Sequence, residues 1–194
     1  MNNQQTDVLQ ASIRLISKID RKKFIFEFVS YYVVVNLILL VLGGSFQWIF
    51  LIVVFVFTGL YLLVKHWINR RQLKKIVMGQ FDFVKTNHPD LSLFIPIMEK
   101  NSSHYSIKRA ALYFIQDKLY LDAFRQTGFA SIPSESISIP YGDDFVIKEA
   151  FQTNDALLFN GQLIDTTYSF AVARQPELIE ALRPFYPKNE KEVS

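Results

Sequence analysis

The chain of 194 residues contains no cysteine. It therefore has no disulfide scaffold, thiolate metal site, cysteine nucleophile or thiol redox centre, and nothing in it requires an oxidising compartment. Glycine is scarce, with seven residues, and neither a Gly-x-Gly-x-x-Gly loop nor a Walker phosphate-binding loop occurs. The patterns His-Glu-x-x-His and Gly-x-Ser-x-Gly are absent as well. Because the common enzyme motifs are missing, we expect a non-enzymatic protein without a cofactor.

Metal-binding patterns are equally sparse. The three histidines, His66, His88 and His104, are scattered along the chain without metal-ligand spacing. Asp143 and Asp144 form an acidic pair directly after Gly142, but an isolated acidic pair in a turn is more often solvated than bound to a cation. We expect no metal site.

The two charge signs are distributed unevenly. Residues 1–75 contain ten Lys and Arg against three Asp and Glu, a net charge of +7, whereas residues 76–194 contain eleven against fifteen, a net charge of −4. A domain that binds nucleic acid needs basic surface, which the acidic C-terminal part lacks. We therefore expect no nucleic-acid partner.

Two long apolar runs stand close together in the first third of the chain. Residues 24–42 form a run of 19 residues with one charge, Glu27, and residues 45–64 form a run of 20 residues with none. Each run, as a helix, would span a hydrocarbon core of roughly 30 Å. The sequence predicts a transmembrane hairpin over residues 24–64, with the uncharged link Gly43-Gly44-Ser45 as its turn.

Basic residues flank this hairpin on both sides. They are Arg14, Lys18, Arg21, Lys22 and Lys23 before it, and Lys65, Arg70, Arg71, Lys74 and Lys75 after it. The positive-inside rule then predicts a multi-pass protein of the cell membrane with both termini in the cytoplasm. Four of these residues are candidate contacts for lipid headgroups, although a topology signal alone explains them: Arg70, Arg71, Lys74 and Lys75.

Few polar side chains interrupt the apolar runs. Asn36 lies near the middle of the first run, and Thr58 lies in the second. Both are candidate intramembrane contacts, because a polar group in a bilayer is stabilised by a hydrogen bond to another helix or subunit. Two helices cannot enclose a pore, so conduction would require an oligomer or a larger partner. The sequence does not decide whether the protein forms a homo-oligomer.

Helices are also predicted on both sides of the hairpin. Residues 1–23 are predicted to form an amphipathic cytoplasmic helix, which would lie on lipid or pack on protein. Its apolar arc consists of Val8, Leu9, Ile13, Leu15, Ile16 and Ile19. Residues 65–90 form a helical connector that ends at Asn87-His88-Pro89, because proline restricts the residue before it to extended backbone.

From residue 91 to residue 187 the pattern changes to short β-like runs, for which we expect six or seven antiparallel strands. Residues 111–115 and 119–124 predict a hairpin, and Asn160-Gly161 is the strongest turn signal of the chain. Pro176 starts a C-terminal helix. Residues 188–194 are expected to form a disordered tail.

The order of two membrane spans, a β-rich domain containing Ser-Ile-Pro-Ser-Glu-Ser-Ile and Leu-Leu-Phe-Asn-Gly, and a terminal amphipathic helix resembles the YcxB-like membrane proteins of bacteria. The resemblance covers residues 24–64 and 103–186. It implies an α+β membrane protein: a two-helix transmembrane hairpin with a cytoplasmic, antiparallel, pleckstrin-homology-like (PH-like) domain capped by a C-terminal helix. It brings no functional residues with it.

These observations favour a membrane-anchored adaptor or scaffold that presents a PH-like domain to an unidentified protein partner. Pro133 and Pro140 mark residues 134–139 as an edge strand, and the candidate partner-binding residues are Ser136, Ser138, Asp143 and Asp144. The alternative is an accessory subunit of a transporter or envelope-synthesis complex that contacts its partner through the transmembrane hairpin. In either case the lipid bilayer is the other expected partner.

Overall fold

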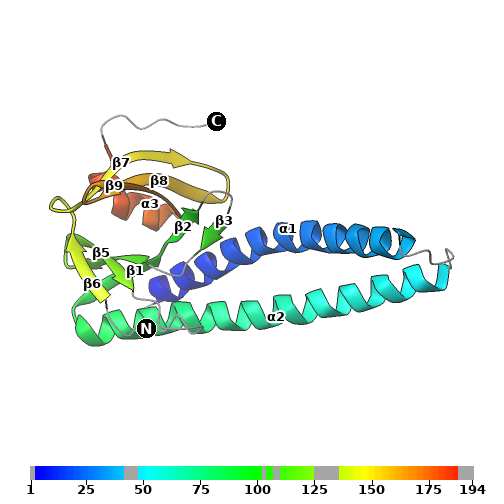
Figure 1. The fold of residues 1–194 in the computed structure, drawn as a ribbon. Helices are drawn as coiled ribbons and strands as arrows, with labels where there is room; N and C mark the ends of the chain where they lie inside the picture. The colour runs from blue at the N-terminus through cyan, green and yellow to red at the C-terminus, as the bar shows by residue number, and fades with distance from the viewer. Residues whose placement is uncertain (1–2, 42–47, 102–103, 107–109, 125–135, 188–194) are drawn as a thin grey trace. The chain divides into compact units, whose positions relative to one another are not determined.

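The computed structural model describes residues 3–41, 48–101, 104–106, 110–124 and 136–187. Two long helices, α1 (Asn3–Val41) and α2 (Trp48–Asn87), precede the strands, and α3 (Pro176–Leu182) and the 3-10 turn η1 (Arg183–Phe185) follow them (Figure 1). The strands are β1 (Leu91–Pro96), β2 (Met98–Asn101), β3 (His104–Ser106), β4 (Ala110–Ile115), β5 (Lys118–Phe124), β6 (Ser136–Pro140), β7 (Phe145–Gln152), β8 (Ala156–Leu163) and β9 (Thr166–Ala173). The protein is therefore of mixed α+β class, as the sequence predicts.

The strands form two antiparallel sheets. The first has the order β1-β4-β5-β6, and the second has the order β3-β2-β9-β8-β7. Only Ile97 separates β1 from β2, so one extended run of chain contributes to both sheets. This run is a part of the fold for which the sequence patterns named no strand.

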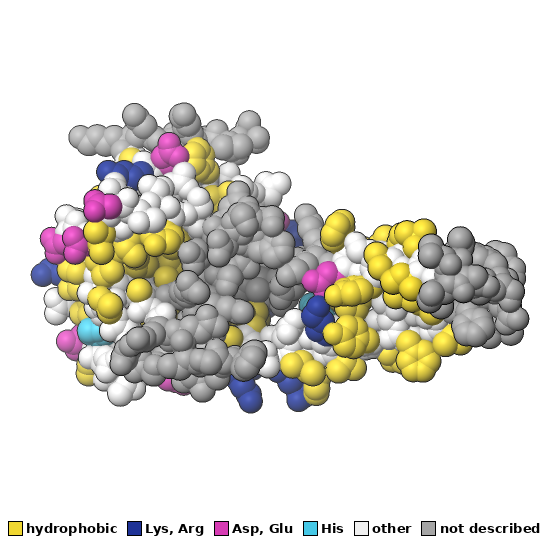
Figure 2. All heavy atoms as spheres, viewed as in Figure 1, with side chains coloured by type: hydrophobic (Ala, Val, Ile, Leu, Met, Phe, Trp, Pro, Cys, Tyr) yellow, Lys and Arg dark blue, Asp and Glu magenta, His cyan; other side chains and the backbone are white. Residues whose placement is uncertain are grey.

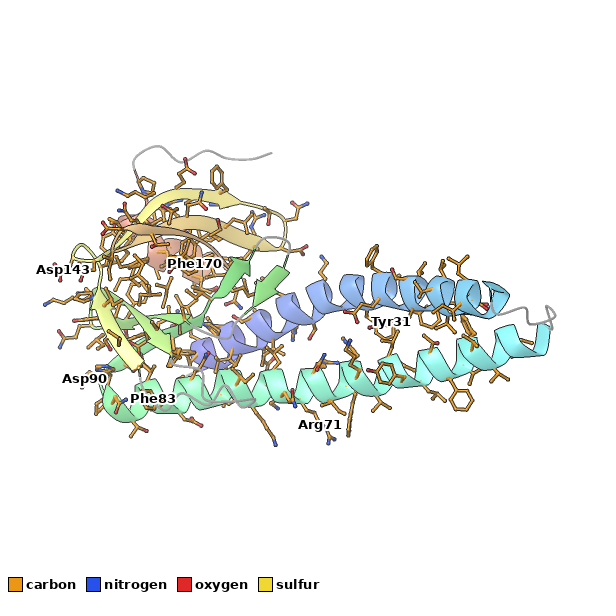
Figure 3. All side chains as sticks on the ribbon, in the orientation of Figure 1. Tyr31, Arg71, Phe83, Asp90, Asp143 and Phe170 are labelled. Carbon is orange, nitrogen blue, oxygen red and sulfur yellow. The ribbon has the colours of Figure 1, made fainter. Side chains whose placement is uncertain are left out.

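The hydrophobic core lies between the two sheets. Leu112 of β4, Leu121 of β5 and Phe159 of β8 are among its buried members, and Phe170 of β9 points into it (Figure 3). Leu178 and Leu182 of α3 complete the core. Pro176 occupies the first turn of α3, where its missing N–H has no intrahelical partner to lose.

The helices contribute to two compact units. The domain unit contains residues 1–16 and 74–194, and the helix-pair unit contains residues 17–73. Within the domain unit, Val8 and Leu9 of α1 and Val77 and Val84 of α2 are buried. The apolar arc of the N-terminal helix therefore packs on protein, one of the two outcomes left open by the sequence.

Gln5 ties the first turns of α1 to the edge of β1. Its side-chain N–H donates to the Phe94 carbonyl at 2.9 Å, and its side-chain oxygen accepts the Phe94 N–H at 2.7 Å. Gln175 adds a further link, donating to the Asp7 carbonyl at 3.2 Å. The edge of β1 that does not pair with β4 is thus occupied at Phe94 by a side chain.

The two segments of the helix-pair unit run antiparallel. Lys65 and Glu27 form an ion pair of 3.0 Å, and the rings of Phe28 and Phe55 meet edge to face with centroids 5.1 Å apart. Large apolar side chains face outward on both helices, including Phe26 at 73% and Phe57 at 69% exposure (Figure 2).

One helix of the described residues, within Ile52–Asn87, is long and apolar enough to cross a membrane. The apolar part of the other helix, Phe24–Ile38, is shorter. The link Gly43-Gly44-Ser45, Ser134 and the tail 188–194 lie outside the described residues.

The prediction of a turn at Asn160-Gly161 is wrong. Both residues lie inside β8, opposite Ser169 and Tyr168 of β9, and the chain turns at Ile164, which has a φ of +55°. Gly161 serves close packing instead, because a Cβ there would lie 2.9 Å from Cε2 of Phe170. Asn160 accepts a hydrogen bond from Ser169 at 2.8 Å and so belongs to the strand.

Candidate functional site: the edge strand β6 and its polar cluster

Strand β6 forms one edge of the first sheet. It pairs with β5, and no further strand of the described residues pairs with its other side. The Tyr141 N–H donates to the Leu119 carbonyl at 2.9 Å, which makes these two a hydrogen-bonded pair. Antiparallel pairs alternate, so the next bonded pairs involve Ile139 and Ile137. The backbone groups of Ser136 and Ser138 therefore point to the free edge.

A polar cluster lies on the face of this sheet opposite the core. Oδ1 of Asp122, on β5, accepts hydrogen bonds from the Tyr113 hydroxyl at 2.8 Å and the Ser138 hydroxyl at 2.7 Å. The Tyr113 oxygen also lies 3.2 Å from Nε2 of His88. We call these four residues the Asp122 cluster. The Tyr113 and Ser138 hydroxyl oxygens also lie 2.8 Å apart. Each hydroxyl has one hydrogen, so if both donate to Asp122, the lone pairs of the Tyr113 oxygen remain to accept from His88.

Strand register explains how the cluster assembles. Leu119 and Leu121 of β5 face the core, which turns Asp122 to the opposite side. Its two cross-strand neighbours are Ala111 and Ser138, which are both small. The carboxylate is therefore flanked by a small residue on each neighbouring strand.

The carboxylate of Asp122 is buried and only partly satisfied. The residue is 1% exposed, and its Oδ2 has no hydrogen-bond partner among the described residues. Burial, and to a lesser degree the charge of Asp122, raise the pKa of the Tyr113 phenol above its ordinary value. The Tyr113 ring stacks on that of Tyr120, with centroids 5.5 Å apart.

Asp143 and Asp144 lie in the exposed turn between β6 and β7 (Figure 3). Gly142 opens this turn with a φ of +95°, a conformation that glycine adopts without strain. The Asp144 carbonyl accepts the Ile164 N–H at 2.6 Å, which holds the turn against the β8–β9 hairpin. Within the described part of the chain, no three His, Cys, Asp or Glu side chains are grouped as metal ligands.

The candidate intramembrane residues occupy opposite helices of the helix-pair unit. The Asn36 side chain donates to the Tyr32 carbonyl of its own helix at 2.6 Å, and Thr58 is half-buried. The contact of Asn36 or Thr58 with another helix or subunit stays a prediction.

The candidate headgroup residues are exposed along α2: Arg70, Arg71, Lys74 and Lys75. The Arg71 guanidinium lies over the ring of Trp67, 3.6 Å from its centroid. Such a cation–π contact orients the guanidinium and keeps its charge available.

A groove of about 520 Å³ lies between α1 and the start of α3. Its charged lining residues are Asp7, Glu177 and Arg14. With both signs of charge present, the lining favours no single class of ligand.

Three members of the Asp122 cluster escaped the sequence patterns. The sequence patterns place His88 before a proline, and Tyr113 and Asp122 in the two strands of a predicted hairpin. The available signal was an acidic residue in the otherwise apolar strand 119–124, since Asp is depleted in strands and rarely buried without a partner.

Comparisons with protein-family models, with curated proteins and with solved structures found no match.

Proposed function

We propose that this protein is a membrane-anchored, non-enzymatic adaptor. The helix pair holds a PH-like domain at the cytoplasmic face of the membrane, and the free edge of β6 binds a protein partner. We propose the YcxB-like membrane proteins, which its sequence resembles, as its family.

The apolar surface of the helix-pair unit supports the membrane anchor. Exposed side chains such as Phe26, Phe57 and Leu63 are costly in water and stabilising in lipid. Lys65 and Glu27 pair near the basic end of this unit, so the polar groups at that end satisfy each other.

The Gln5–Phe94 contact favours a chain that crosses the membrane twice over a chain that crosses it once. Residues that share two hydrogen bonds must lie on the same side of a membrane. If the chain between them enters the bilayer, it must therefore return. The basic flanks then favour the cytoplasm for both chain ends.

The order of the strands supports a PH-like domain. The chain of β1 and β2 passes from the first sheet into the second. Strands β1, β4, β5 and β6 form a four-stranded meander, which β7, β8 and β9 follow along the chain. The C-terminal helix α3 then packs against the core. A PH-like fold has these features in this order.

The observation that carries the adaptor function is the edge of β6 that no strand of the described residues pairs with. An exposed edge is a template for an added strand, and proteins use such edges to recognise extended segments. Pro140 ends β6, which limits pairing to a short stretch.

The test uses the tagged full-length protein, purified in mild detergent with any partner quantified by mass spectrometry. Ser136→Pro removes an N–H that points to the free edge and leaves the β5 ladder intact, and Ser136→Thr is the matched control. We expect the proline variant to lose a partner that the threonine variant retains. Equal recovery of the partner would overturn the edge as its binding site.

The accessory-subunit alternative is tested in the same experiment by Asn36→Leu and Thr58→Val. These variants remove intramembrane polar groups without touching the domain unit. A partner lost on these changes and kept by Ser136→Pro would move the function into the helices.

A further inference from the structure

The face of the first sheet opposite the core carries a row of side chains that leads to its free edge. Ala111, Asp122 and Ser138 lie directly opposite one another on β4, β5 and β6. A strand added to β6 would place its own residue next in this row, about 4.8 Å beyond Ser138. Ser138 would then be the residue of the row between that added residue and the buried Asp122.

Among the described residues, Asp122 has no cationic partner of the kind that a buried carboxylate needs. Its Oδ1 accepts two hydroxyl hydrogen bonds, and its Oδ2 accepts none from the described residues. A buried anion is costly unless it is paired with a cation and hydrogen-bonded. An ammonium or guanidinium group at Oδ2 would supply both interactions.

Two further observations favour a cation. The stacked rings of Tyr113 and Tyr120 lie beside the carboxylate, and Tyr120 is half-buried, so a cation bound at Asp122 would lie near aromatic rings. Residues 76–194 carry a net charge of −4, which attracts a basic segment.

We infer that the free edge of β6 binds an extended basic segment of a partner protein, and that one Arg or Lys of this segment reaches over Ser138 to Oδ2 of Asp122. This inference rests on the proposed adaptor function and names the chemistry of the partner. The backbone of the segment pairs with Ser136 and Ser138, while its cation supplies selectivity.

The test measures fluorescence anisotropy of labelled nine-residue peptides added to the full-length protein in detergent micelles. One peptide alternates Thr and Val with a central Arg, and its twin carries citrulline, which is neutral and has nearly the same shape. We expect the Arg peptide to bind at least tenfold more tightly to the wild-type protein. This comparison needs no substitution, so it does not depend on the folding of a variant.

Asp122→Asn keeps an oxygen for both hydroxyls and removes the charge, so it should abolish the preference for Arg. The matched control Asp143→Asn, in an exposed turn, should leave the preference unchanged. Equal binding of the two peptides to the wild-type protein, or an unchanged preference in Asp122→Asn, would overturn the inference, as would the failure of both peptides to bind.

The outcomes separate this inference from the adaptor proposal. If both peptides bind equally and Ser136→Pro abolishes the binding of both, the edge of β6 remains a docking site, but Asp122 does not bind the cation. If Ser136→Pro leaves the tight binding of the Arg peptide intact, the edge itself is overturned.

Discussion

Gln5 pairs with the backbone of Phe94 in the way that a neighbouring strand would. One side-chain amide satisfies both the N–H and the carbonyl of a strand residue 89 positions away, at 2.7 and 2.9 Å respectively. Gln5 is 5% exposed and Phe94 is fully buried. Water cannot replace these bonds without opening the contact.

Gln5→Ala should destabilise the domain unit by about 2–3 kcal/mol, because two buried backbone groups lose their partners. Hydrogen exchange read by mass spectrometry should show faster exchange in the peptide that contains Phe94. Gln10→Ala, at an exposed position of the same helix, is the control and should change exchange little. Unchanged protection of Phe94 in Gln5→Ala would contradict the role assigned to Gln5.

Gly161→Ala should destabilise the β8–β9 hairpin by about 1–3 kcal/mol, because its Cβ would meet the Phe170 and Phe145 rings at 2.9 and 3.0 Å. Thermal unfolding in detergent measures the loss. The double variant Gly161→Ala/Phe170→Leu should recover part of it, since leucine vacates some of the ring's space. A single variant as stable as the wild type would show that the rings move aside without cost.

Tyr113 should make the folded state sensitive to alkaline pH. The phenol has a raised pKa in the folded protein, whereas the unfolded chain ionises near its ordinary value of 10.0. Its contribution is fully present below pH 10 and is lost as pH rises toward the folded pKa, by at most about 1.4 kcal/mol per pH unit.

Tyr113→Phe should therefore flatten the fall of melting temperature between pH 10 and pH 11. The pKa of Tyr141 is also raised by burial, so Tyr141→Phe is a matched comparison that leaves the Tyr113 effect in place. A Tyr113→Phe variant with the wild-type slope would contradict the assignment.

The Glu27–Lys65 pair should stabilise the antiparallel arrangement of the helix pair. Lys65→Met should lower the thermal stability in micelles, by about 1 kcal/mol given that both side chains are partly exposed. The exchanged pair Glu27→Lys/Lys65→Glu should recover most of the loss. Additive losses in the exchanged variant would mean that the two charges do not interact.

The absence of cysteine makes the topology directly testable. A single cysteine introduced at Ser45, outside the described residues, should react with an impermeant maleimide in intact cells, whereas one at the exposed Asn154 should react only after lysis. Labelling at Asn154 in intact cells would place the domain unit outside. Ser194→Cys serves as a second reporter of the C-terminal side.

Much of the secondary structure follows from local signals. Pro89 and Pro176 mark the end of α2 and the start of α3, and the hairpin of β4 and β5 follows from its apolar runs and polar turn. Asn160-Gly161 misleads because the same dipeptide that favours a turn also suits a strand position with no space for a Cβ. Only the packing of Phe145 and Phe170 distinguishes the two.

The Asp122 cluster could not be predicted because its parts come from four separate segments. Its hydrogen bonds depend on the register of β4, β5 and β6 and on the end of α2, none of which is a local property. Ser138 was a candidate for its place on an edge strand. Its hydrogen-bond partner, the buried Asp122, can be identified only once the register of β5 and β6 is known.

The division of the chain into its two units has a practical consequence for protein production. A fragment beginning at residue 91 would lack α1 and therefore Gln5. The N–H and carbonyl of Phe94 would then be unpaired at an exposed strand edge, which promotes aggregation. A soluble piece that keeps the native contacts has to join residues 3–16 to residues 74–187 through an artificial linker.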